Sequence, residues 1–147
     1  MFSKKPLFAL LPFLLLLSCK DDEIEFPVEP AISINSISPA NATEYVDEVT
    51  ISIHYEDGDG DLGENVDGVK NCFVTDNRIG ITYEYRIEQL APSNSKIPIK
   101  GNINLNIQGQ AITDGSNSQT ANYTVYVTDR AGHKSNTANT GNITIHK

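Results

Sequence analysis

One stretch of the chain is dense in carboxylates at a spacing that suits a metal ion. It runs from Glu56 to Asp67 with the sequence EDGDGDLGENVD, and it holds six acidic residues but no lysine or arginine. Carboxylates this close repel one another, whereas a Ca²⁺ ion accepts roughly six to eight oxygen ligands. The alternate residues Asp57, Asp59 and Asp61 can converge on one ion because the glycines between them let the backbone curl. We predict a structural Ca²⁺ site there; the alternative is a solvated acidic loop that binds ions only weakly.

The spacing matches only part of the calcium loop of an EF-hand. Counting from Asp57, aspartates occupy positions one, three and five. Leu62 stands at position six, where an EF-hand has glycine, and Gly68 at position twelve, where it has glutamate. Helical patterns do not flank the stretch. One or two ligands must therefore come from elsewhere in the chain.

Asp129 is the predicted distant ligand. If successive strands reverse direction, the strand before Asp57 and the strand before Asp129 run the same way, so both residues fall at the same end of a sandwich. The loop 90–100 and the start of the domain share that end. Asp76 and Asp114 are expected at the other end.

The start of the chain has the pattern of an exported protein. Two lysines, an apolar run over residues 6–17 and the small residue Ser18 lead to Cys19. This order is typical of a secretory signal peptide, and the run is shorter than the ~20 residues of a membrane-spanning helix. We predict that residues 1–18 are cleaved.

The motif L-L-S-C that ends at Cys19 resembles the lipobox of bacterial lipoproteins. The resemblance implies that Cys19 becomes the first residue of the mature chain and carries acyl chains that anchor it in a membrane. The next residues resemble the export signal of Bacteroidota surface lipoproteins, which implies the outer face of the outer membrane; they are Lys20, Asp21, Asp22 and Glu23. A plain secretory signal and a charged tether without an address remain the alternatives.

Composition divides the mature chain into a tether and one domain. Residues 19–30 are acidic, contain two prolines and predict a flexible tether, and residues 31–147 have the size of one domain. Cleavage removes two lysines, so the formal net charge falls from −8 to −10. This balance argues against nucleic acid, which binds basic patches, and favours cation binding. Cys72 has no partner if Cys19 is lipidated, and we expect it to be buried.

Apolar and polar residues alternate along the domain, and long helical periodicity does not occur. The clearest predicted strands are 49–55, 81–87, 103–107, 123–128 and 143–145, with weaker ones at 31–37 and 70–75. One apolar face per strand suits antiparallel sheets that are solvated on one side. About seven short strands predict an all-β, immunoglobulin-like antiparallel β-sandwich.

The segment 125–136 has the sequence VYVTDRAGHKSN and resembles the last hairpin of bacterial immunoglobulin-like domains, which often carry V-x-D-x-A-G-N-x-S. His133 stands where asparagine is usual. With the acidic loop, the whole domain resembles single-domain lipoproteins of Bacteroidota. The resemblance implies a fold and a cellular address rather than a chemistry.

A catalytic set cannot be assembled from the sequence. The three histidines, His54, His133 and His146, lack metal-ligand spacing, and no nucleophile or paired acid can be given a role. We therefore expect a non-enzymatic outer-membrane lipoprotein whose domain binds an envelope or extracellular protein or glycan as an interaction or adhesion module. The alternative is an accessory lipoprotein that captures a glycan or nutrient. An exposed aromatic cluster beside a cleft would favour the alternative, and a flat exposed patch the first hypothesis.

Overall fold

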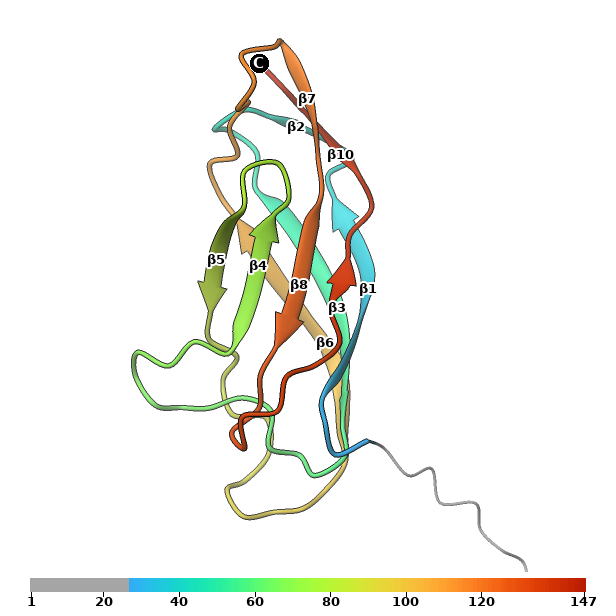
Figure 1. Ribbon diagram of the computed structural model, residues 1–147, viewed down its shortest axis with the longest axis vertical. Helices are drawn as coiled ribbons and strands as arrows, with labels where there is room; N and C mark the ends of the chain where they lie inside the picture. Colours follow the sequence, from blue (N-terminus) through green and yellow to red (C-terminus); the bar gives the residue numbers. More distant parts are fainter. Residues whose placement is uncertain (1–26) are drawn as a thin grey trace, which may run out of the picture.

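Strands with one apolar face each form two large antiparallel sheets, which pack these faces against each other (Figure 1). The computed structural model describes residues 27–147. The first sheet has the order β1-β3-β6 and consists of β1 (Ala31–Ser38), β3 (Val49–Asp57) and β6 (Ile99–Ile107). The second has the order β5-β4-β8-β9 and consists of β4 (Cys72–Asp76), β5 (Ile81–Tyr85), β8 (Tyr123–Val127) and β9 (Ala138–Asn139). The predicted all-β, antiparallel β-sandwich is confirmed.

A third, smaller sheet has the order β2-β10-β7 and consists of β2 (Asn41–Thr43), β7 (Ser118–Ala121) and β10 (Ile143–His146). β10 runs antiparallel to β7 but parallel to β2. Only Asn122 separates β7 from β8. One extended segment therefore contributes to two sheets and joins the small sheet to the second large one.

The seven predicted strands are all present, with shifted ends. β3 continues past Tyr55 to Asp57, and β6 begins at Ile99 rather than Ile103. The strands β2, β7 and β9 were not predicted, because they have two to four residues and too few alternating apolar side chains. Their formation depends on neighbouring strands that are distant in the sequence.

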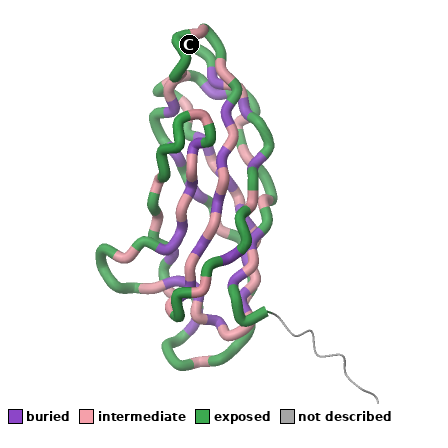
Figure 2. Tube along the Cα trace, viewed as in Figure 1, coloured by how far each residue is buried: buried purple, intermediate pink, exposed green. Residues whose placement is uncertain are grey.

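The core lies between the two large sheets. Its fully buried members include the inward residues of β3 and β8, which are Val49, Ile51, Ile53, Tyr123, Val125 and Val127. Figure 2 shows buried positions alternating with partly buried ones along these strands. Cys72 belongs to the core as expected, and burial raises the pKa of its thiol to about 12. The thiol is therefore protonated at neutral pH and packs as a small apolar group.

The two ends of the sandwich carry different loops. The basal end, defined as the end where Pro27 lies, holds the loops 58–71, 86–98 and 128–137 (Figure 1). The Pro27 carbonyl accepts the Gly58 N–H there at 2.7 Å. The distal end holds the loops 44–48 and 108–117 and the C-terminal Lys147. The predicted signal peptide, Cys19 and the Lys20–Glu23 signal lie outside the described residues.

Candidate metal centre

Asp57 lies inside the sandwich because the alternation of β3 continues through it. The inward face of this strand is apolar from Val49 to Tyr55, and Asp57 is the next residue on that face, with no exposed surface. One oxygen of its carboxylate, Oδ2, accepts the N–H of Leu62 at 2.7 Å. A buried carboxylate is costly unless its charge is compensated, so the strand places a negative charge where a cation would stabilise it.

The acidic loop is held tightly against two neighbouring segments. Gly60 and Gly63 have φ angles of 71° and 87°. A Cβ atom on Gly60 would collide with the Ile97 carbonyl oxygen, and one on Gly63 with the Glu88 carbonyl oxygen. Arg130, from the loop after β8, donates a guanidinium N–H to the Gly63 carbonyl at 2.6 Å. These contacts define the position of the loop independently of any ion.

Three carboxylates converge in this loop. Asp57, Asp59 and Asp61 each offer one oxygen, and these oxygens lie within 4.8 Å of one another. The Oδ1 atom of each residue is buried and receives no hydrogen bond from the described residues. Buried polar atoms are nearly always paired, so a positive charge beside these three carboxylates would stabilise their unpaired oxygens. The cluster can therefore hold a metal ion.

The electrostatics of the cluster disfavour its ionised form. Burial raises the pKa of Asp57 above its usual value; the Leu62 N–H opposes this shift, and the charges of Asp59 and Asp61 add to it. Burial also raises the pKa of Asp61, as do the charges of Asp129 and Asp59. A carboxyl group whose pKa rises on folding stabilises the fold fully below its unfolded pKa, and this stability is lost as the pH rises through the folded pKa. At neutral pH the ionised cluster destabilises the domain unless a cation binds.

Asp129 lies beside the cluster, at the end of the sandwich that the strand directions predict. A bridge pairs it with Leu62. Its Oδ1 atom accepts the His133 N–H at 2.8 Å, and its Oδ2 atom lies 2.9 Å from the His133 ring Nδ1. The hydrogen bond to Asp129 raises the pKa of His133. Both oxygens of Asp129 therefore contact His133. Asp129 does not belong to the cluster of converging oxygens, which consists of the other three predicted ligands, Asp57, Asp59 and Asp61.

The remaining carboxylates of the acidic stretch lie elsewhere. Glu56 is 3.5 Å from His54, measured from Oε1 to Nε2. The Asp67 side chain is fully exposed and pairs with Arg86 at 3.0 Å. Glu64 is partly buried and lies outside the cluster of converging oxygens. Three of the six acidic residues therefore form the candidate site.

Two features of the site escaped the sequence reasoning. Arg130 is a nearby positive charge that lowers the pKa of Asp61, although the acidic stretch itself has no basic residue. Arg130 lies in a turn, where periodicity gives no signal. The burial of Asp57 did have a signal, since one further step of the alternation from Tyr55 places it on the inward face.

A second buried charge lies at the distal end. Asp76, the last residue of β4, is fully buried, and its Oδ2 atom is 2.6 Å from a guanidinium nitrogen of Arg78. Arg78 also donates to the Ala111 carbonyl at 2.9 Å and to the Gln119 side chain at 3.1 Å. Because both charges are paired and hydrogen-bonded, this group closes the distal end of the core and is structural.

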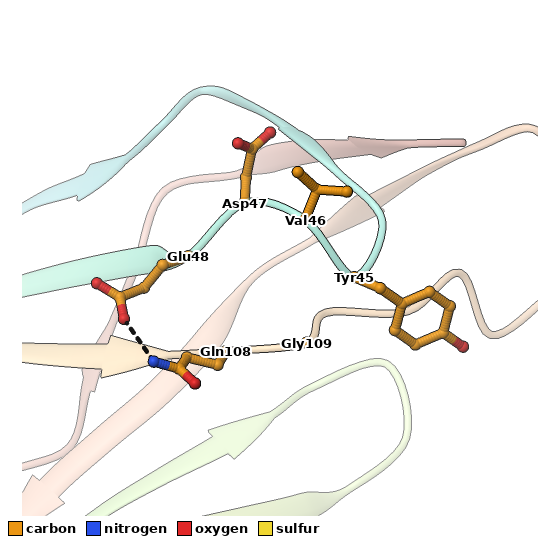
Figure 3. Close-up of a pocket in the computed structure, with 6 residues that line it drawn as sticks. All are labelled: Tyr45, Val46, Asp47, Glu48, Gln108 and Gly109. Atoms are coloured by element: carbon orange, nitrogen blue, oxygen red, sulfur yellow. Dashed lines mark hydrogen bonds between the residues drawn. The ribbon is translucent and has the colours of Figure 1, made fainter.

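A shallow pocket of ≈ 390 Å³ lies on the distal surface between the turn 45–48 and residues 108–109. Figure 3 shows the Tyr45 side chain at one end of this pocket, and Glu48 hydrogen-bonded to Gln108 at the other. Tyr45 has a φ of 58°, which is uncommon for a bulky residue. Tyr45 and Val46 are 69% and 76% exposed. The distal end thus presents two apolar side chains beside carboxylates.

An aromatic pair lies on the outward face of the second sheet. Phe73 of β4 and Tyr126 of β8 stack with a centroid distance of 4.7 Å and an interplanar angle of 16°. The Lys134 ammonium lies 3.8 Å from the Tyr126 ring centroid. The two faces of the Tyr126 ring are therefore covered by Phe73 and Lys134.

Comparison with known proteins finds no matching family model, curated protein or solved structure. Within residues 27–147, none of the chain forms a helix long and apolar enough to cross a membrane.

Proposed function

We propose that this protein is a non-enzymatic, surface-exposed lipoprotein of the outer membrane whose immunoglobulin-like domain is stabilised by Ca²⁺ and acts as an interaction or adhesion module. The observation that carries the proposal is the set of three buried, unpaired carboxylate oxygens in the basal loop. The lipobox-like motif at Cys19 and the residues Lys20–Glu23 support the cellular address. The partner would be an envelope or extracellular protein or glycan.

Calcium suits this cluster better than other common ions. Its donors are all carboxylate oxygens, which hard cations prefer to histidine or cysteine ligands. The oxygens lie within 4.8 Å of one another, a separation that ligands about 2.3–2.6 Å from one Ca²⁺ ion can span. Mg²⁺ demands octahedral geometry and sheds water reluctantly. Backbone carbonyls or water would complete the Ca²⁺ shell.

Adding Ca²⁺ to the metal-free protein should raise its melting temperature. An ion that binds only the folded state stabilises it by about 2.7 kcal/mol at a hundredfold excess over Kd. Titration calorimetry should record the heat of binding and scanning calorimetry the rise in melting temperature, with a smaller rise for Mg²⁺. If neither heat nor a change in melting is observed with Ca²⁺, the stretch is only a solvated acidic loop.

Asp57→Asn provides a variant whose effect should change sign with the metal. In chelator at neutral pH the variant should be more stable than wild type, because it removes the buried Asp57 carboxylate. Burial in the folded protein raises the pKa of this carboxyl group, so its ionised form is unfavourable there. This advantage should shrink as the pH falls and the wild-type carboxyl takes up a proton. In Ca²⁺ the variant should be the less stable protein, because it lacks a charged ligand. Asp67→Asn is the matched control from the exposed part of the same stretch and should show neither effect.

Two surface features favour an interaction module over glycan capture. Tyr45 is the single aromatic residue among those that line the shallow distal pocket. Tyr126, a partly buried tyrosine on the outward face of the second sheet, has its ring faces covered by Phe73 and Lys134, which leaves no free face to stack on a sugar. The exposed Tyr45 and Val46 instead offer the aromatic and aliphatic contacts that are common in protein interfaces.

Cys19→Ala should release the protein from the membrane fraction, because acyl chains on Cys19 are the only anchor proposed. Fractionation with an alkaline wash measures this, and retention of the variant in washed membranes would contradict the lipid anchor.

Replacement of the four residues from Lys20 to Glu23 by alanine should abolish surface labelling of intact cells while the lipid remains. Undiminished labelling would leave these residues as a tether without an address.

A further inference from the structure

We propose that the basal end of the domain docks on the lipid surface that holds Cys19, with the side chains of Val66, Leu90 and Ile97 inserted at the bilayer interface. The docking rests on the lipid anchor of the proposed function. It assigns a second role to the basal end, in addition to the candidate Ca²⁺ site. The occupant of this surface is a phospholipid bilayer.

Half of the exposed large apolar side chains of residues 27–147 lie at the basal end. They are Val28, Val66, Leu90 and Ile97, which are 53%, 55%, 37% and 49% exposed. Leu90 lines a shallow surface hollow with Asn65, and the backbone of Ile97 lies against Gly60. Single exposed apolar residues are ordinary, but four at the end of the domain where the chain leaves toward Cys19 are placed to contact a membrane interface.

The tether is short enough to keep this end near the bilayer. Residues 19–26 separate the described chain from the proposed lipid, and eight residues span at most about 29 Å when fully extended. Tethering converts docking into an intramolecular step at high effective concentration. A few half-exposed side chains then suffice for a contact that would be too weak for a free protein. The distal end, with Tyr45, faces away from the bilayer in this arrangement.

Charge makes the docking sensitive to the cation. The basal cluster of Asp57, Asp59 and Asp61 is repelled by anionic headgroups, and a bound divalent cation offsets two of its three charges. Lys96 is exposed next to Ile97, and its ammonium group suits lipid phosphates. Ca²⁺ should therefore strengthen the docking.

The mature lipoprotein can be tested in vesicles of phosphatidylethanolamine and phosphatidylglycerol, with a polarity-sensitive fluorophore on the cysteine introduced by Ile97→Cys. Cys72 should not be labelled, because it is buried and its pKa is about 12. A nitroxide-labelled lipid should quench this probe at least about twofold more than a probe introduced by Val46→Cys at the distal end. Leu90→Cys provides a second basal position and should behave like Ile97→Cys.

The outcomes separate the docking from the anchor. Co-flotation with the vesicles and selective quenching at the two basal positions support the proposal. Co-flotation with equal quenching at basal and distal positions overturns the docking and leaves the anchor intact. Failure to co-float overturns both. Chelator should reduce basal quenching without releasing the protein, and quenching that is unchanged by chelator would remove Ca²⁺ from the docking while the apolar contact stands.

Discussion

Arg78→Met is expected to lower the free energy of unfolding by about 3–5 kcal/mol, the usual cost of removing one partner of a buried ion pair. The side chains of Asp76 and Arg78 are 0% and 8% exposed, and the guanidinium also binds the Ala111 carbonyl and the Gln119 side chain. Methionine keeps much of the packing volume but leaves the Asp76 carboxylate buried without its counter-charge. Urea unfolding at neutral pH measures the loss.

Two further variants test that explanation. Asp76→Asn combined with Arg78→Met should recover part of the lost stability, because it removes the uncompensated charge. Arg86→Met removes an arginine from an ion pair with the fully exposed Asp67 and should leave stability near the wild-type level. If Arg78→Met and Arg86→Met proved equally mild, the Asp76–Arg78 pair would not be the closure of the distal core.

Gly63→Ala should displace the acidic loop and abolish the stabilisation by Ca²⁺. Gly63 has a φ of 87°, a left-handed conformation that costs other residues about 1–2 kcal/mol. The added Cβ would also collide with the Glu88 carbonyl oxygen, and overpacking typically costs about 1–3 kcal/mol more. Relief of that collision requires the loop to move, which separates the three carboxylates. Melting curves with and without Ca²⁺ measure both effects.

Gly68→Ala is the matched control for this substitution. Gly68 also has a left-handed φ, 82°, but a Cβ atom there would meet nothing within 4 Å. It should therefore incur the conformational cost alone and keep the response to Ca²⁺. An equal loss of response in both variants would mean that general destabilisation, rather than the position of the loop, explains the effect of Gly63→Ala.

The sequence was most informative about features that periodicity and strand direction determine, which are the positions of the strands and the end of the sandwich at which a residue lies. Alternation from Val49 to Tyr55 predicted the central strand of the first sheet, and reversal of successive strands predicted that Asp57 and Asp129 lie at the same end. The direction of a side chain within a turn follows no such period. The contact of Asp129 with His133, which lies in such a turn, therefore has no signal in the sequence.

Long-range polar contacts were the other feature beyond sequence reasoning. Arg78 lies two residues after Asp76 in the sequence, but its other partners, which include Ala111 and Gln119, come from segments more than thirty residues away. Arg130 likewise reaches the Gly63 carbonyl across 67 positions. Such contacts depend on how turns pack at the ends of the sheets. Composition and periodicity describe the strands themselves and not this packing.

The parallel pairing of β2 and β10 has a mechanical consequence. Pro27 and Lys147 lie at opposite ends of the sandwich, β2 follows the N-terminal strand, and β10 leads to Lys147 (Figure 1). A load applied between these ends pulls the two strands past each other along their common axis. The three residue pairs that join them are then sheared together instead of being unzipped one at a time. Because resistance to force depends on the rate of unfolding, this pairing opposes extension of the domain between its N-terminal and C-terminal ends.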